Sequence, residues 1–159
     1  MGLGTHSGVR RVREALEERG FEPEILELEQ TARSAAEAAD ALGVRVEQIV
    51  KSLVFRRRRT GRPVLVLAGG SNRVDENRVS HLLSEPVGMA DAAYVREKTG
   101  FSIGGVPPVG HVEQLTTFVD EDLLLESEVW VAAGHTHAVF GLKPADLMRI
   151  TDGQVVALK

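Results

Sequence analysis

Two apolar runs separated by a short basic turn constrain the fold more than any other feature of this sequence. The first run, residues 46–55, is rich in β-branched side chains and is followed by four arginines, Arg56 to Arg59. A second apolar run covers residues 64–67, and the stretch before it, Thr60-Gly61-Arg62-Pro63, has the composition of a turn. Apolar runs on both sides of a glycine-containing turn are typical of a β-hairpin. The sequence therefore predicts a hairpin with an arginine-rich tip.

The remaining patterned segments mix helices and strands without a regular βαβ rhythm. Apolar periodicity and cap-and-stop residues predict helices at residues 7–20, 34–42, 75–83 and 92–99, a short helical turn at 120–122 and a helix entry at 143–147. Strands are expected at residues 24–28, 129–133, 138–142 and 154–158. This mixture favours a single α/β domain over residues 1–159, with a mixed, largely antiparallel sheet and helices packed around it.

Composition excludes several classes of protein. Aromatic residues make up only 4% of the chain, so the core must be built from Val, Leu, Ile and Ala. There is no cysteine, which excludes disulfides, thiolate metal sites and a cysteine nucleophile. No apolar run reaches the roughly 20 residues of a membrane helix, and residues 1–8 lack the apolar segment of a signal peptide, so we expect a cytoplasmic protein without membrane partners. The net charge of -4 indicates that any contact with nucleic acid is local.

Lys51 is the first candidate for chemistry, because it is a cation inside an otherwise apolar run. If the strand alternates, its side chain shares a face with Ile49, Leu53 and Phe55. A lysine in that position either protects an edge strand against aggregation or faces a polar cleft. In a cleft, a desolvated ammonium would stabilise an anionic ligand or a developing oxyanion.

The second candidate is the segment 100–111, which is dense in glycine and proline. Glycines allow backbone N–H groups to approach a ligand closely, and prolines lower the entropy cost of holding such a loop. The segment lacks the Gly-Lys-Ser/Thr ending of a phosphate-binding P-loop. It is therefore either a tight structural loop or a rigid loop whose amides bind an oxyanion or a carbonyl.

Four segments, taken in order, resemble one known family. They are Thr31-Ala32-Arg33-Ser34, Ile49-Val50-Lys51-Ser52-Leu53-Val54-Phe55, Gly104-Gly105-Val106-Pro107-Pro108-Val109-Gly110-His111 and Trp130-Val131-Ala132-Ala133-Gly134. The ordered set resembles the YbaK/ProX family of aminoacyl-tRNA deacylases, a domain that is also inserted in many bacterial prolyl-tRNA synthetases. The resemblance runs from about Arg10 to the C-terminus. It implies an α/β fold on a mixed, barrel-like sheet, and the removal in trans of a wrong amino acid, often Cys or Ala, from prolyl tRNA.

The resemblance also implies roles for individual residues. Lys51 matches the family lysine, and Gly104 to Pro108 match its Gly-x-x-x-Pro loop. By this resemblance Lys51, Gly104 and Gly105 form the catalytic site, with Lys51 holding the anionic 3′ end or the polarised carbonyl and the two amides binding the carbonyl region. The expected amino-acid pocket is formed by Thr31, Pro108, Gly110, His111 and Gly134. The stretch 135–140 differs from some members of the family because it contains no carboxylate.

The expected partner is the 3′ end of an aminoacyl-tRNA, with a synthetase or an elongation factor as further partners; the sequence leaves the oligomeric state open. Arg57 and Arg59 in the hairpin tip are candidate ligands of tRNA phosphates, although a basic hairpin tip can also be simply solvated. His135 and His137 are two ligands of a metal site that would need a third, so no metal or other cofactor is expected. A non-catalytic tRNA- or nucleotide-binding module, and a metal-dependent hydrolase, are the alternative functions.

Overall fold

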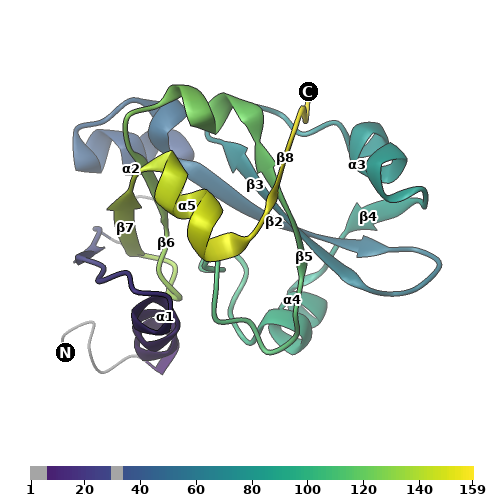
Figure 1. The fold of residues 1–159 in the computed structure, drawn as a ribbon, viewed down its shortest axis with the longest axis horizontal. Helices are drawn as coiled ribbons and strands as arrows, with labels where there is room; N and C mark the ends of the chain where they lie inside the picture. The colour runs from purple at the N-terminus through teal and green to yellow at the C-terminus, as the bar shows by residue number, and fades with distance from the viewer. Residues whose placement is uncertain (1–6, 30–33) are drawn as a thin grey trace.

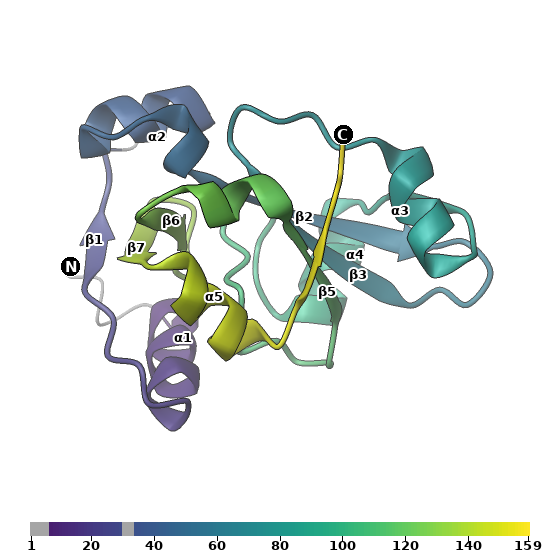
Figure 2. The same cartoon turned by 45° about the horizontal axis from the view of Figure 1, so that its top comes forward.

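The computed structural model describes residues 7–29 and 34–159, which form two β-sheets surrounded by helices (Figure 1). The large sheet has the strand order β4-β2-β3-β5-β8 and contains β2 (Val50–Arg57), β3 (Pro63–Gly69), β4 (Val87–Met89), β5 (Thr116–Asp120) and β8 (Gln154–Val156). The small sheet has the order β1-β7-β6 and contains β1 (Ile25–Glu27), β6 (Val129–Ala132) and β7 (Ala138–Leu142). Figure 2 shows the small sheet at one end of the molecule and the tip of the β2–β3 hairpin at the other.

The predicted hairpin is confirmed. Strands β2 and β3 pair antiparallel from Val50 opposite Gly69 to Arg56 opposite Pro63, and the Arg57 N–H donates to the Arg62 carbonyl across the turn (2.9 Å). The strand begins later than residue 46, because the segment before it forms a short 3-10 turn, η2 (Val46–Gln48). The Gln48 side chain accepts a hydrogen bond from the backbone N–H of Arg45 at the start of that turn (3.0 Å).

The prediction of a mixed α/β fold is confirmed, and most strand pairs are antiparallel. The exceptions are β3 with β5 and β5 with β8, which pair in parallel. Within the described ranges the sheets do not close into the barrel-like shape that we expected. Among the described residues, one isolated parallel bridge between Ile49 and Trp130 joins the two sheets. The edge of β2 therefore stays open between that bridge and the residues that pair with β4.

The helices are α1 (Ser7–Glu18), α2 (Ala35–Leu42), α3 (Glu76–Leu83), α4 (Ala92–Thr99) and α5 (Pro144–Thr151), with a 3-10 turn η3 (Glu121–Leu125) after β5. Their ends follow the sequence. The Ser34 hydroxyl accepts the Glu37 N–H at the start of α2 (3.1 Å), and the Asp75 carboxylate accepts the Asn77 N–H at the start of α3 (2.9 Å). Gly43 ends α2 in the left-handed conformation (φ 70°). No helix in the described part of the chain is long and apolar enough to cross a membrane.

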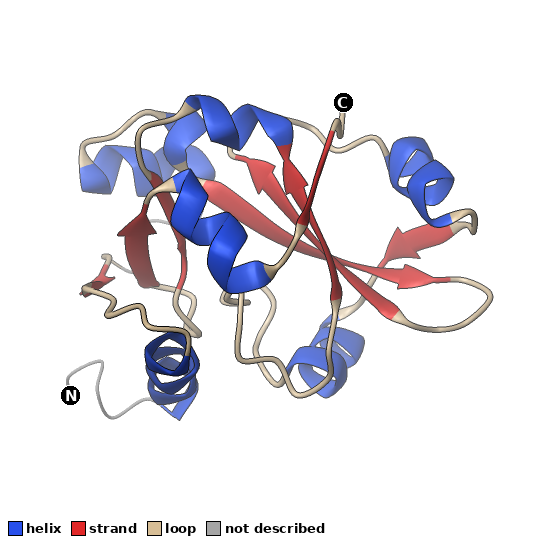
Figure 3. Cartoon of the chain, in the orientation of Figure 1, coloured by secondary structure: helices blue, strands red, loops and turns tan. Residues whose placement is uncertain are grey.

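Both faces of the large sheet are covered, and Figure 3 shows helices on both sides of it. One face joins α1, α4, α5 and the small sheet in a core that contains Val50 and Val54. The other face forms a second core with α3 that contains Phe55, with Leu53 packed against it. Because side chains alternate along a strand, the even-numbered residues of β2 face the first core and the odd-numbered residues face the second. This alternation decides the surroundings of every polar side chain on β2.

Candidate active site

A cavity of about 420 Å³ lies where the small sheet meets the open edge of β2. It is called the lysine cavity below. Its walls are mostly small or aliphatic, and they come from α2, β2, the small sheet and the Gly/Pro-rich loop. The lining residues include Leu28, Ala35, Ala38, Ile49, Lys51, Ser52, Ile103, Gly104, Trp130, Ala132 and Val139. Such a space fits a small organic group better than a folded partner.

The open edge of β2 supplies backbone groups to this cavity. Strand β4 pairs only with residues 55–57 of β2, so the strand before them has β3 on one side alone. The Val54 carbonyl accepts the Ala90 N–H on the side away from β3 (3.2 Å). In an antiparallel ladder, residues two apart point their N–H and C=O groups the same way, so the backbone polar groups of Ser52 face away from β3 as well. The Ser52 hydroxyl and the Trp130 indole N–H, both buried, have no hydrogen-bond partner among the described residues.

Lys51 lies half-buried among the residues that line this cavity. Its ammonium donates to the backbone carbonyl of Asn72, in the turn that follows β3. It forms no ion pair with any carboxylate in residues 7–29 and 34–159. A half-buried cation that is hydrogen-bonded to an uncharged carbonyl keeps its net charge. It therefore retains much of its attraction for an anion.

The turn that holds Lys51 is itself fixed by a buried carboxylate. Asp120 is 2% exposed. One of its oxygens accepts the Gly69 N–H (2.9 Å) and the Asn72 side-chain amide (2.7 Å). The same Asn72 amide donates to Asp122 (2.8 Å), and this hydrogen bond lowers the pKa of the Asp122 carboxyl. The sequence predicted a helical turn at 120–122, which η3 confirms, but no local pattern indicated that Asp120 would support the turn beside Lys51.

The two central glycines of the loop differ in what their amides can do. Gly104 lines the lysine cavity with a φ of 86°, and its N–H has no hydrogen-bond partner within the described chain. The Gly105 N–H donates to the Ser102 carbonyl (2.9 Å). A Cβ at Gly105 would lie 2.9 Å from the backbone carbon of His135. The expectation that both amides bind substrate is therefore corrected, because the Gly105 amide is already used within the loop and its Cα packs against the His135 segment.

Pro108, Gly110 and His111 lie elsewhere. They line a separate hollow of about 570 Å³, called the histidine hollow below, together with residues of α1 and α5, and it shares no lining residue with the lysine cavity. The His111 Nε2 lies 2.7 Å from the Pro107 carbonyl oxygen. Burial lowers the pKa of the His111 imidazole. The structure therefore places these three residues away from Lys51, and their role in binding substrate stays a prediction.

Of the two remaining residues of the expected pocket, the structure describes Gly134, which does not line the lysine cavity. Gly134, with a φ of 91°, packs against the beginning of α1, where an added Cβ would lie 2.6 Å from the Gly8 carbonyl oxygen. Thr31 lies outside the described residues. Ala132, from the same small-residue segment as Gly134, does line the lysine cavity.

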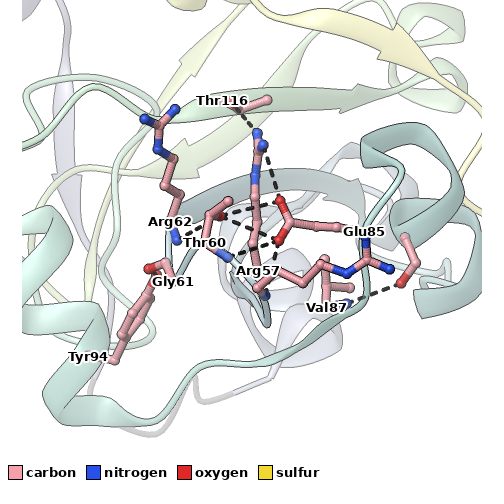
Figure 4. A network of polar contacts seen from close by, with 10 residues as sticks. Arg57, Thr60, Gly61, Arg62, Glu85, Val87, Tyr94 and Thr116 are labelled. Carbon is pink, nitrogen blue, oxygen red and sulfur yellow. Dashed lines mark hydrogen bonds and ion pairs between the residues drawn. The ribbon is translucent and has the colours of Figure 1, made fainter.

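The two candidate arginines of the hairpin tip, Arg57 and Arg59, have different surroundings, and the role of Arg59 stays a prediction. Figure 4 shows Arg57 between Glu85 and Thr116, with its guanidinium 3.6 Å from a Glu85 oxygen and 2.9 Å from the Thr116 hydroxyl. Desolvation opposes ionisation of Glu85, but the hydrogen bonds from Thr60 and from the Arg59 N–H lower the pKa of its carboxyl. Arg57 has a side chain only 18% exposed, so it holds the hairpin to Glu85 rather than standing free for phosphate; the Arg59 side chain is exposed.

His135 and His137 lie next to each other, with ring centroids 5.9 Å apart. No group of three His, Asp or Glu side chains that could hold a metal ion occurs in the ranges that the structure describes. The absence of a metal cofactor stays a prediction. No serine hydroxyl is hydrogen-bonded to a histidine among the described residues, so the site contains no pair typical of an activated serine nucleophile.

Comparison with known proteins identifies the family. Residues 29–150 match the sequence profile of the aminoacyl-tRNA editing domain. The chain belongs to this family. The matched range contains Lys51, Asn72, Gly104 and Asp120, and therefore the elements that build the lysine cavity. Editing domains of this family act on mischarged aminoacyl-tRNA.

Relatives of this editing domain include proteins of its own length and segments of larger enzymes. It is 46% identical to the protein in "Crystal structure of a putative trans-editing enzyme for prolyl tRNA synthetase", with a TM-score of 0.91 over 97% of this chain and 98% of that one. It is 29% identical over 122 residues to the "Putative Cys-tRNA(Pro)/Cys-tRNA(Cys) deacylase EbsC" of Enterococcus faecalis, covering 76% of this chain and 74% of that protein. It is 35% identical over 96 residues, 58% of this chain, to the proline–tRNA ligase of Limosilactobacillus fermentum, of which it spans 17%.

The geometry of this editing domain suits an ester whose carbonyl needs polarising. The lysine cavity combines one ammonium, one unpaired amide at Gly104 and small aliphatic walls. A cation and an amide N–H directed at the same space stabilise negative charge that develops on a carbonyl oxygen.

Proposed function

We propose that this editing domain acts in trans as a hydrolase that cleaves the ester between a wrong amino acid and the 3′ end of its tRNA. The observation that carries the proposal is that Lys51 and the unpaired Gly104 amide line one cavity of small aliphatic residues. The likeness over nearly the whole length of a protein described as a trans-editing enzyme supports the same activity here.

The reaction needs little from the protein because an aminoacyl ester is already activated. A water oxygen attacks the ester carbonyl carbon, and the carbonyl oxygen becomes an oxyanion. The bond from that carbon to the ribose oxygen then breaks, the ribose oxygen takes a proton, and free amino acid and tRNA are released. In this proposal Lys51 and the Gly104 amide stabilise the oxyanion, and the cavity positions ester and water.

We further propose that the substrate carries a small side chain such as Ala or Cys on prolyl tRNA. The walls are aliphatic at Ala35, Ala38, Ala132, Ile49 and Val139, and they offer an apolar surface to such a side chain. A synthetase rejects a slightly smaller amino acid only weakly, so a second, size-selective hydrolytic site is needed. The relative described as a deacylase of Cys-tRNA supports this class of substrate.

The test compares one tRNA charged with alanine, cysteine or phenylalanine. We expect release of labelled alanine and cysteine to be at least about tenfold faster than release of phenylalanine, since steric exclusion of a large group is the basis of a size sieve. Equal rates for the three esters would contradict the size sieve. Binding of charged tRNA without release of any amino acid would indicate a non-catalytic binding module, and loss of activity on adding a chelator would indicate a metal-dependent hydrolase.

A further inference from the structure

The hairpin carries its arginines on two faces, and Met89 joins the surroundings of one pair to the lysine cavity. Arg57 faces Glu85 on the side of the second core. Arg56 faces the other way, on the side of Ser52 and Val54, because side chains alternate along the strand, and Arg58, in the turn directly after β2, lines the same surface hollow as Arg56. We propose that Arg56 and Arg58 bind the phosphodiester backbone of the single-stranded 3′ end of an RNA whose terminal ester occupies the lysine cavity. This inference rests on the proposed function and extends it to the path of the substrate.

Both arginines are exposed, oriented and unpaired. The Arg56 guanidinium carbon lies 5.3 Å from the centroid of the Tyr94 ring, and the Arg58 Nε donates to the Val87 carbonyl (3.3 Å). Neither forms an ion pair with a carboxylate anywhere in the described chain. A guanidinium held in place by a ring or a carbonyl loses less entropy when it binds a phosphate, and its remaining N–H groups fit phosphate oxygens.

A hollow of about 310 Å³ lies directly beside these two arginines, lined by Arg56, Arg58, Gly88 and Met89. A Cβ at Gly88 would lie 2.6 Å from an Arg58 guanidinium nitrogen, so the glycine leaves room for the arginine in its present position. Met89 also lines the lysine cavity, so the hollow and the cavity are neighbours. A ligand that occupies both the cavity and the hollow therefore crosses Met89.

The rim between the two spaces is apolar. Met89 is 56% exposed and Ile103, which also lines the cavity, is 51% exposed. The exposed methionine and isoleucine offer apolar contact to a nucleotide base. The guanidinium groups nearby offer positive charge to the phosphates of the nucleotides that follow. Two guanidinium groups with separate partners, the Tyr94 ring and the Val87 carbonyl, can each bind a separate phosphate. The order of cavity, apolar rim and cations matches the order of ester, terminal nucleoside and phosphates in an aminoacylated RNA end.

The decisive comparison uses two substrates that differ only in phosphates. In the Arg56→Gln/Arg58→Gln variant we expect kcat/KM for aminoacyl-tRNA to fall about tenfold at low salt, mainly through KM, and the slope of log affinity against log salt to flatten by about 1.4, from two phosphate contacts on a single strand. For 3′-aminoacyl-adenosine, which has no phosphate, kcat/KM should be unchanged. The matched control is Arg62→Gln/Arg78→Gln, which removes the same charge from two exposed positions, one in the hairpin tip and one on α3.

An equal loss of kcat/KM on both substrates in the Arg56→Gln/Arg58→Gln variant would overturn the proposal. An equal change of the salt slope in the control variant would also overturn it, because it would indicate a general effect of net charge. Binding of a short uncharged single-stranded RNA with the tRNA 3′ sequence tests the same surface without catalysis. Weaker binding in the Arg56→Gln/Arg58→Gln variant but not in the control supports the RNA path even if no ester is hydrolysed, an outcome that would refute only the proposed function. Unchanged RNA binding overturns the path.

Discussion

The lysine cavity and the histidine hollow receive residues from the same short loop but differ in what they offer a ligand. The cavity is lined by Gly104, whose amide has no partner in the described chain, by Lys51 and by small aliphatic residues. The hollow receives Pro108, Gly110 and His111, and its imidazole is already engaged with the Pro107 carbonyl. One continuous motif in the sequence therefore contributes to two separate regions. Gly104 lines the lysine cavity, and Pro108, Gly110 and His111 lie beside α1 and α5.

The strongest test of this contrast is Lys51→Ala. Loss of a fixed cation beside a developing oxyanion should lower the single-turnover rate of deacylation about 10²- to 10³-fold. The melting temperature should change little, because Ala leaves no unpaired charge behind. Lys51→Arg should not restore full activity, since the planar guanidinium is longer and differs in shape.

A variant in the histidine hollow provides the control for that measurement. His111→Gln should deacylate within about twofold of the wild type, because surface or hollow positions that do not contact the reacting atoms contribute little to the transition state. A Lys51→Ala protein that folds and keeps the wild-type rate, or a His111→Gln protein that loses as much activity as Lys51→Ala, would reverse the assignment of the two regions.

A smaller effect should follow from Asn72→Ala, which removes the side-chain hydrogen bonds to Asp120 and Asp122. Because the Asn72 carbonyl then holds the Lys51 ammonium less firmly, we expect kcat to fall roughly fivefold, a coupling of about 1 kcal/mol. The same substitution in a Lys51→Ala background should cause no further loss. Independent, multiplicative losses in the double variant would indicate that the Asn72 turn contributes to stability alone.

The smallest effect concerns pH and the histidine hollow. Burial lowers the pKa of folded His111 below its ordinary value of 6.5, while the neighbouring Arg19 acts in the same direction. The unfolded chain therefore binds more protons than the folded chain as the pH falls below 6.5, and stability contributed by neutral His111 decreases there. It is fully present above that pH.

The measurement is the melting temperature of wild type and His111→Gln between pH 5 and pH 8. We expect the wild type to lose more of its melting temperature on acidification than the variant does, while the pH dependence of deacylation is the same for both. A constant difference between the two proteins across this range would show that His111 does not titrate on unfolding.

Local sequence chemistry predicted much of the scaffold. The hairpin turn, the caps at Ser34 and Asp75 and the glycine that ends α2 depend on residues only a few positions apart. Lys51 and Gly104, which the family resemblance assigned to one site, both line the lysine cavity. These predictions succeed because capping, turn formation and strand alternation are decided within about one turn or one strand.

The sequence by itself determined which segments become helices, strands and turns, that a cation lies within an apolar strand, and which family the chain resembles. Only the tertiary structure decided which arginines are free and what holds the lysine. Arg57 is withdrawn by Glu85 on another element, and Asn72 is fixed by Asp120, 48 positions away. Such pairs depend on how strands and helices pack across the core, and no short-range preference of the chain specifies that packing.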